Sequence, residues 1–242
     1  MNNFLSTKNI PVRERLIFAM DLPSVAAAEE MIDRLGDSVL FYKLGLQMFM
    51  TGGYFQLVEK LRKLGKKIFV DLKFFDVPET VKNAVEQLQS RGVTFATVHG
   101  NDDIMRAAAA AKGSTKILAV TVLTSLDKGD MEDLGFQCDV AELVLSRARR
   151  ALALGCDGVI SSGLEARKLR EGVDDKLIVI TPGIRPASNT AVKDDQKRVV
   201  TVQDAFMNGA DYIVVGRPIR AAADPKAAAE EIQRQIAEVF KQ

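Results

Sequence analysis

Short apolar runs recur along the chain, and each is followed by a stretch with helical periodicity. The runs are continuous rather than alternating between apolar and polar residues, as is typical of strands buried on both faces of a sheet. This pattern predicts eight strands. They lie at 16–21, 39–43, 68–70, 94–98, 116–123, 158–160, 177–180 and 212–215.

The segments between these runs predict helices, and eight strand-helix units in 242 residues give about 30 residues per unit, the usual size of a βα repeat. We therefore predict an α/β protein in which residues 1–242 form a single (β/α)8 TIM barrel. An open doubly wound sheet is the alternative. It is disfavoured because the first strand-helix turn, at 21–25, lacks a glycine-rich fingerprint. The expected helices lie at 24–35, 47–64 with a break at Gly52-Gly53, 77–90, 102–112, 140–154 and 202–208. One further helix follows the sixth strand and ends at about Arg170, and another follows the eighth strand and ends at Phe240.

Polar residues collect where the predicted strands end. In this architecture the catalytic groups lie at the C-terminal ends of the strands, so these side chains should converge on one mouth. Such a convergence is hard to explain by solvated loops alone. The residues are Asp21, Lys43, Asp71, Lys73, His99, Thr124, Pro182, Gly216 and Arg217.

Residues 67–80 are the most informative stretch. A buried strand there ends in Asp71 and Lys73, which point the same way because strand side chains alternate between faces. Two carboxylates and an ammonium at a strand end suit a site better than a core. Asp76 follows once the chain has left the strand, and with Glu79 it also fits a helix-capping box. Both interpretations of Asp76 stay open.

The loops after the last two strands commonly form a phosphate site in such barrels. Gly216 would let a backbone N–H approach an oxyanion, and Arg217 offers a bidentate fork. The stretch at about 183–200 is unusually long for a compact domain, so we interpret it as a lid that supplies Arg185 and Gln196 as donors. A solvated loop is the alternative.

The composition excludes several classes of function. Lys plus Arg number 33 and Asp plus Glu 32, a formal charge of +1, which predicts neither a nucleic-acid nor a membrane surface. The first 15 residues lack a signal-type apolar core and no run approaches 18 apolar residues, so we expect a cytoplasmic protein. Cys138 and Cys156 are expected to be reduced. His99 is the only histidine, so a multi-histidine metal site is excluded and catalysis must rely on carboxylates, lysines and arginines.

Several segments, in order and across residues 16–219, resemble the orotidine 5′-phosphate decarboxylase family in its bacterial monofunctional form. The signature-like stretch runs from Asp71 to Thr80 as DLKFFDVPET. Four more motifs complete the set: FAMD ending at Asp21, KLG from Lys43, TPGIRPA containing Arg185, and VVGRPI containing Arg217. Each motif alone is moderately specific, whereas the ordered set is strong.

The resemblance implies decarboxylation of orotidine 5′-monophosphate to UMP and CO2 in de novo pyrimidine biosynthesis, without metal or organic cofactor. It also implies a homodimer with sites at the interface. The matching positions assign roles. Lys73 would protonate C6, and Asp71 would face the scissile carboxylate. Lys43 would bridge the charged array and the ribose, whose hydroxyls Asp21 would bind. Asp76 and Thr80 would reach the partner's site. Thr124 and Pro182 would line the base pocket, and the phosphate would be held by Gln196, Arg185, Gly216 and Arg217.

Two rival functions remain open. A metal-dependent decarboxylase or aldolase of sugar phosphates on the same barrel shares the Asp-x-Lys-x-x-Asp pattern, but it carries an acidic residue where this chain has Lys43. A binding protein without catalysis would keep the pocket, although here every charged residue that the chemistry needs is present. His99 and the polar excursion at 126–138 match no assignable role.

Overall fold

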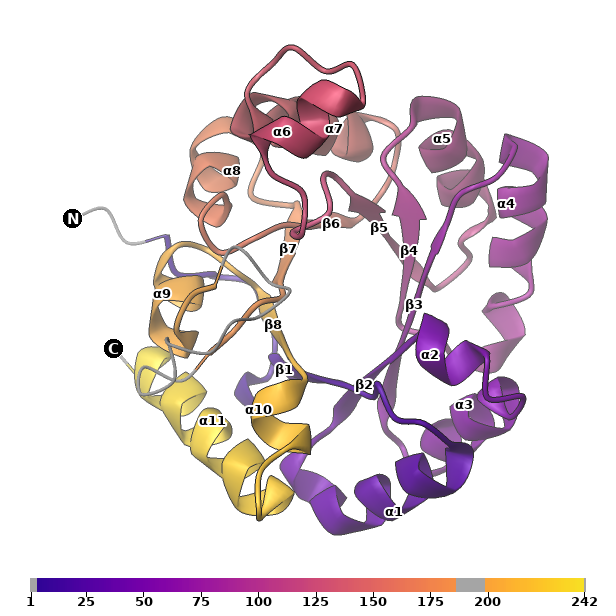
Figure 1. The fold of residues 1–242 in the computed structure, drawn as a ribbon, viewed down its shortest axis with the longest axis vertical. Helices are drawn as coiled ribbons and strands as arrows, with labels where there is room; N and C mark the ends of the chain where they lie inside the picture. The colour runs from indigo at the N-terminus through magenta and orange to yellow at the C-terminus, as the bar shows by residue number, and fades with distance from the viewer. Residues whose placement is uncertain (1–3, 186–198, 242) are drawn as a thin grey trace.

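The computed structural model describes residues 4–185 and 199–241. Within these ranges eight parallel strands pair in sequence order, and β8 also pairs with β1, so the sheet closes into a barrel (Figure 1). The predicted α/β class and (β/α)8 barrel are confirmed. The strands are β1 (Leu16–Ala19), β2 (Phe41–Gly45), β3 (Lys67–Phe74), β4 (Phe95–His99), β5 (Lys116–Val120), β6 (Gly158–Ile160), β7 (Ile178–Thr181) and β8 (Tyr212–Val215).

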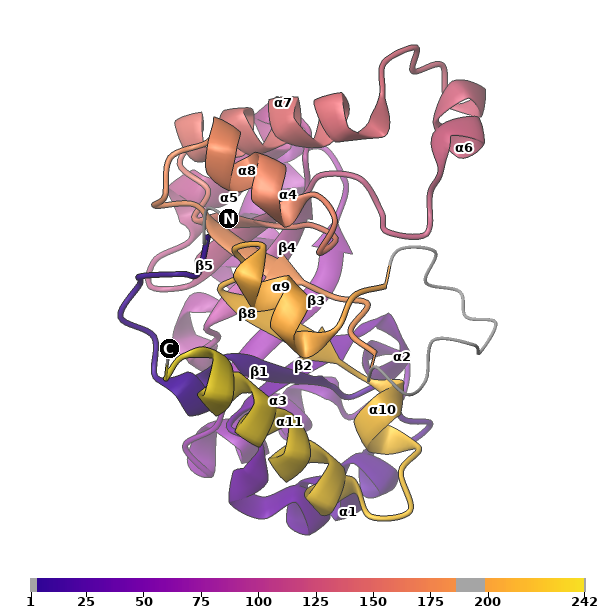
Figure 2. The same ribbon diagram turned by 90° about the vertical axis from the view of Figure 1, so that its left-hand side faces the viewer.

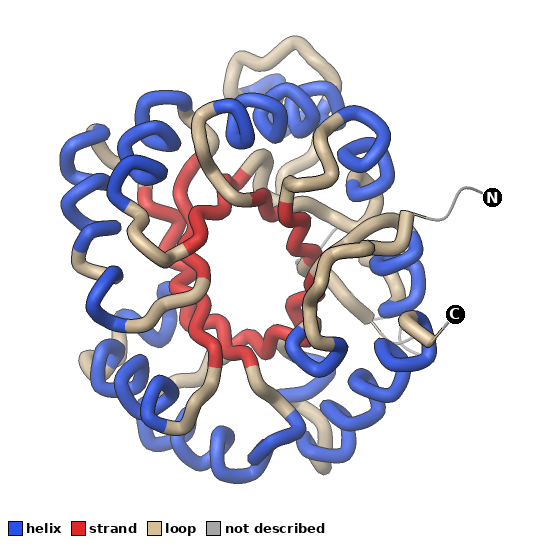
Figure 3. Tube along the Cα trace, turned by 180° about the vertical axis from the view of Figure 1, so that it is seen from behind, coloured by secondary structure: helices blue, strands red, loops and turns tan. Residues whose placement is uncertain are grey.

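Helices surround the ring of strands (Figure 3), and short helices α2, α6 and α10 lie toward one end of the barrel (Figure 2). No helix in the described part of the chain is long and apolar enough to cross a membrane. The helices are α1 (Val25–Leu35), α2 (Leu46–Phe49), α3 (Tyr54–Lys63), α4 (Pro78–Glu86), α5 (Asp102–Ala111), α6 (Lys128–Asp133), α7 (Val140–Ala153), α8 (Ala166–Gly172), α9 (Val202–Met207), α10 (Arg217–Arg220) and α11 (Pro225–Val239), with 3-10 turns at Val12–Glu14, Gly36–Ser38 and Gln89–Arg91.

The barrel interior is filled by side chains rather than open. Alternate strand residues form an inner cluster in which the ring of Phe95 lies 5.1 Å from that of Phe41 and 5.2 Å from that of Tyr212. A larger apolar cluster lies between the strands and the outer helices. Because the interior is packed, ligands can enter only at an end of the barrel.

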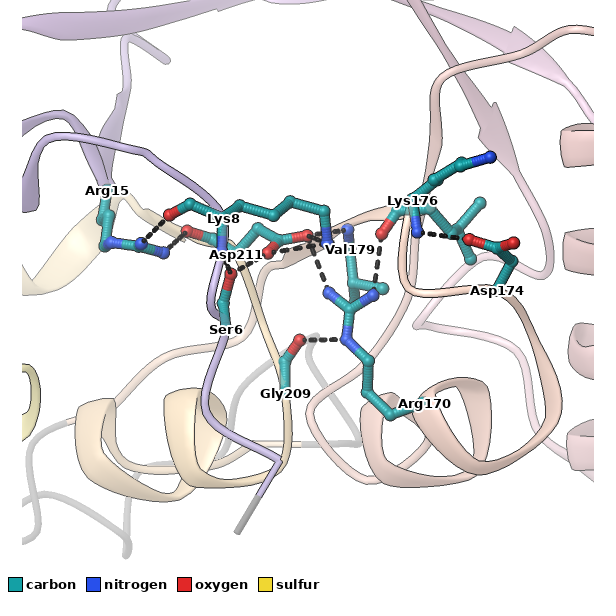
Figure 4. Close-up of polar contacts among 10 residues, drawn as sticks. Ser6, Lys8, Arg15, Arg170, Asp174, Lys176, Val179, Gly209 and Asp211 are labelled. Carbon is teal, nitrogen blue, oxygen red and sulfur yellow. Dashed lines mark hydrogen bonds and ion pairs between the residues drawn. The ribbon is translucent and has the colours of Figure 1, made fainter.

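At the end where the strands begin, a buried ionic network surrounds Asp211, as Figure 4 shows. The Asp211 carboxylate has no solvent exposure and accepts hydrogen bonds from the Arg170 guanidinium (2.7 Å) and the Val179 N–H (2.9 Å). Lys8 Nζ lies 3.1 Å from the same carboxylate, and Ser6 also donates to it. The N-terminal segment is thereby fastened across this end.

The fifth strand is shorter than predicted. It ends at Val120 rather than Leu123, because its neighbour β6 has only three residues and its last pair is Val120 with Ile160. The chain beyond therefore leaves the sheet. The excursion at 126–138 contains α6, whose first turn has a capping box between Asp127 and Asp130.

The capping interpretation of Asp76 is wrong. The N-cap of α4 is Val77, which has no side-chain cap, and Pro78 occupies the first turn. Asp76 is exposed, and its carboxylate accepts a 2.7 Å hydrogen bond from the Val77 N–H. Its side chain is therefore not used to close the helix end with Glu79.

Candidate active site

A cavity of about 560 Å³ opens where the strands end. Seven of the eight strands, all except β4, contribute to its wall through their own residues or the loops after them, as predicted from the polar residues at strand ends. Nine predicted site residues line it together. They are Asp21, Lys43, Asp71, Lys73, Thr124, Pro182, Arg185, Gly216 and Arg217.

Four alternating charges from β1, β2 and β3 form a row along one side of this cavity. Lys43 Nζ lies 3.6 Å from Asp21 Oδ1 and 3.2 Å from Asp71 Oδ2, and Lys73 Nζ lies 2.9 Å from Asp71 Oδ1. Gly45 leaves room for the row, since a Cβ there would lie 3.3 Å from Lys43 Nζ. Each carboxylate is therefore held against an ammonium, and Asp71 lies between two.

The backbone at Lys73 is strained. Its φ of 48° is the only positive φ at a non-glycine position in the described residues. Left-handed backbone costs an L-residue with a Cβ about 1–2 kcal/mol. The strain coincides with a register shift of β3 against β4 between Val70 and Phe74. Thr97 on β4 accommodates this local distortion by accepting from the Lys73 N–H (3.0 Å) and donating to Asp71 Oδ1 (2.9 Å).

The charges in the row stabilise one another. Burial alone would raise the pKa of the Asp71 carboxyl, but the positive charges of Lys43 and Lys73 outweigh it and lower that pKa to about 2. Burial would likewise lower the pKa of Lys43, but Asp71 and Asp21 outweigh it and raise that pKa. At neutral pH, Asp71 is therefore an anion and Lys43 a cation.

The far wall of the cavity carries donors from the ends of β7 and β8. Arg185 and Gly183 follow β7, while Gly216 and Arg217 follow β8. Arg220 also lines the cavity, and its guanidinium donates to the backbone carbonyl of Asp21. Cationic groups thus face the cavity from a second side, away from the Asp71–Lys73 pair.

Two predicted site residues within the described ranges do not line this cavity. Asp76 and Thr80 are exposed, at the end of the loop after β3 and in the first turn of α4. Gln196 lies outside the described residues, as does most of the predicted lid at 183–200. His99 ends β4, and its ring lies 4.5 Å from that of Phe75. Burial, followed by the charges of Arg147 and Lys73, lowers the pKa of His99.

Sequence reasoning missed two polar groups that the structure places in or beside the cavity. Thr97 is fully buried within a strand, and a buried hydroxyl requires a hydrogen-bond partner, which was the available signal. Arg220 follows Arg217 by three positions, a spacing that places both on one helix face. Gln47, Leu123 and Ser125 also line the cavity, but nothing in their sequence context distinguishes them.

Comparison with known proteins identifies the family. Residues 14–232 match the model of the orotidine 5′-phosphate decarboxylase / HUMPS family. An orotidine 5′-phosphate decarboxylase of Methylococcus capsulatus is 67% identical over 240 residues, which cover 99% of either chain. One of Rhodopseudomonas palustris is 53% identical over 228 residues, covering 93% of this chain and 96% of the relative.

A solved structure agrees. The crystal structure of orotidine 5′-phosphate decarboxylase from Lactobacillus acidophilus superimposes with a TM-score of 0.81 at 37% identity, covering 92% of this chain and 99% of that one. With the match over residues 14–232 and the full-length relatives, this similarity confirms the resemblance that the motifs indicated: the chain belongs to the orotidine 5′-phosphate decarboxylase / HUMPS family.

Proposed function

We propose that the protein decarboxylates orotidine 5′-monophosphate to UMP and CO2 without a metal or organic cofactor. The observation that carries this proposal is the Asp21–Lys43–Asp71–Lys73 row in a cavity whose other wall carries Arg185 and Arg217. The names of the full-length relatives support it. The reaction would serve de novo pyrimidine synthesis in the cytoplasm.

Lys73 is proposed as the proton donor. Loss of CO2 from C6 leaves an electron pair on a carbon that no carbonyl is positioned to delocalise. A fixed ammonium beside that carbon stabilises the developing charge and then transfers a proton to it. Lys73 Nζ lies 2.9 Å from Asp71 Oδ1, and the Lys73 side chain, which lines the cavity, is 32% exposed. The ammonium is therefore oriented and still accessible to a substrate.

Asp71 is proposed to act through its charge. Its carboxylate is 7% exposed and ionised at neutral pH, so it would repel a substrate carboxylate placed against it. The repulsion disappears when neutral CO2 leaves, which lowers the barrier relative to the bound substrate. Lys43 lies between Asp71 and Asp21 and would link the Asp71–Lys73 pair to the ribose. Asp21 would accept hydrogen bonds from the ribose hydroxyls.

The rest of the cavity is proposed to hold the nucleotide. Thr124 and Pro182 would contact the base, whereas Arg185, Gly216 and Arg217 would bind the phosphate. Gln196 is the remaining phosphate ligand of the proposal. The phosphate is remote from the bond that breaks, so its binding energy would be used to position the base against Lys73.

A homodimer is part of the proposal because Asp76 and Thr80 are exposed and do not line their own cavity. The exposed apolar side chains Phe75 and Val77 flank Asp76, at 65% and 63% exposure. Such a surface suits burial against a second copy of the chain. Asp76 and Thr80 would then reach the ribose and phosphate of the partner's site.

The decisive assay follows the pyrimidine absorbance of orotidine 5′-monophosphate in the presence of the protein, with and without EDTA. We expect turnover at the same rate in both conditions. Lys43 supports this expectation, because an ammonium 3.2 Å from Asp71 disfavours a divalent cation there. No absorbance change at high protein concentration would refute the decarboxylase. Activity lost in EDTA and restored by Mg²⁺ would refute the metal-free reaction.

Mixing two inactive variants tests the shared site. Asp76→Ala and Lys73→Ala protein should each be inactive alone, and activity should return after they are mixed and allowed to exchange subunits. A mixed dimer has one site with both an intact Lys73 and an intact Asp76, so recovery should approach about one quarter of wild type by random pairing. A mixture that stays inactive, although mass spectrometry shows mixed dimers, would place Asp76 outside the partner's site.

A further inference from the structure

A turn after β6 packs against Val200, which pairs with the short segment that carries Arg185. We propose that Gly163, in this turn, is a positioning residue for phosphate recognition, because its missing side chain lets Val200 hold Arg185 at the cavity wall. The inference rests on the proposed function in that it takes Arg185 to contact the phosphate. Gly163 is buried and does not line the cavity itself.

Val200 is tied directly to Arg185. The two short segments that contain them pair as a parallel bridge between Ile184 and Val200. Arg185 N donates to Val200 O at 3.0 Å, and Val200 N donates to Gly183 O at 3.2 Å. Gly183 and Arg185 both line the cavity. A shift of Val200 is therefore transmitted through two backbone hydrogen bonds to the cavity wall.

Val200 occupies the space that a side chain at position 163 would need. A Cβ on Gly163 would lie 2.4 Å from Val200 Cγ2 and 2.9 Å from Cγ1, well inside van der Waals contact. Valine has two methyl groups on its Cβ and restricted rotation about χ1, so rotation exchanges one clash for another. The valine Cβ itself would be 3.2 Å away. The clash must be relieved by moving one of the two backbones.

The turn that holds Gly163 is the more firmly held of the two. Glu165 is buried, and its carboxylate accepts from Ser161 Oγ (3.1 Å), Ser162 N (3.0 Å) and Ser162 Oγ (2.7 Å). Ser161 N also donates to Ile180 O of β7 at 3.1 Å. The Glu165 bonds hold the turn together, and the bond from Ser161 ties it to β7, the neighbour of β6 in the barrel (Figure 1). Val200 therefore yields, and Arg185 moves with it.

The test is Gly163→Ala, measured by calorimetric binding of UMP and of uridine. We expect UMP to bind about tenfold more weakly, because a displaced Arg185 loses part of a charge-assisted contact. Uridine, which lacks the phosphate, should bind as it does to wild type within about twofold. Equal weakening of both ligands, or unchanged UMP binding, would overturn the inference.

Three further variants sharpen the test. The double variant Gly163→Ala/Val200→Ala should recover UMP binding, because removing the valine methyl groups removes the clash. If the double variant bound UMP more weakly than Val200→Ala alone, the inference would be overturned. This comparison also applies if Gly163→Ala does not fold. Gly172→Ala is the matched control, because its Cβ would meet only the movable ends of two long side chains, those of Leu145 at 2.8 Å and Arg149 at 3.2 Å. Arg217→Ala is the positive control for a lost phosphate contact. Wild-type turnover of orotidine 5′-monophosphate separately tests the proposed function.

Discussion

Turnover of orotidine 5′-monophosphate should fall by at least about 10⁴-fold when Lys73 is replaced by alanine, because one side chain supplies both the proton and the charge that stabilises the carbanion. UMP lacks the departing carboxylate, so its affinity should change by less than about tenfold. Single-turnover kinetics and UMP calorimetry measure the two effects. Lys60→Ala, on the outer helix α3, serves as the control. Comparable turnover in Lys73→Ala protein would remove Lys73 from the mechanism.

The strained backbone at position 73 can be tested separately, through the stability of the protein to urea. At ordinary positions glycine is less stable than alanine by about 0.5–1 kcal/mol. At Lys73, where φ is 48°, alanine retains the strain and glycine relieves it. Lys73→Gly should therefore unfold in urea at a concentration no lower than Lys73→Ala, whereas at Lys60 the glycine variant should be the less stable. A normal glycine penalty at position 73 would contradict the strain.

Replacing Asp211 by alanine should lower the free energy of unfolding by about 3–5 kcal/mol, the usual cost of removing one partner from a buried ion pair. Arg170, whose side chain is 5% exposed, would lose its carboxylate, as would Lys8. Urea denaturation measures the loss. The network lies at the opposite end of the barrel from the cavity, so UMP binding below the unfolding transition should be unchanged.

Asp102→Ala provides the matched control for this stability effect. Asp102 also pairs with an arginine, Arg150, but that pair is solvent-exposed, so its removal should cost less than about 1 kcal/mol. If the two variants lost stability equally, burial would not explain the contribution of the Asp211 network to the free energy of unfolding. If Asp211→Ala lost UMP binding while folded, the two ends of the barrel would be coupled.

The sequence was most informative where a local pattern has one structural solution. Continuous apolar runs at regular spacing can bury both faces only in a sheet covered by helices, so the strands and the barrel could be predicted. Once the barrel was assumed, the strand ends placed Asp21, Lys43, Asp71 and Lys73 at one mouth. Two-residue periodicity was enough to point Asp71 and Lys73 the same way. The roles of these residues stay predictions until the variants are measured.

Features that depend on tertiary context were not readable. The positive φ at Lys73 arises where β3 shifts register against β4, and no local signal marks a lysine for that conformation. The length of β5 is limited by its neighbour β6, so its own apolar run overstates it. Asp76 has the spacing of a capping box, but the chain geometry before Pro78 makes Val77 the N-cap. In each case a partner outside the local sequence decided the outcome.

The cavity also has a consequence for the order of events during synthesis. Its wall includes Asp21 on one side of the β1–β8 seam and Arg217 on the other, and these residues stand near opposite ends of the sequence. At typical elongation rates roughly 10–40 s separate their emergence from the ribosome. A nascent chain can therefore display the entire Asp21–Lys43–Asp71–Lys73 row long before it can close the barrel. Until β8 arrives, that charged half must stay soluble without the wall that carries Arg217.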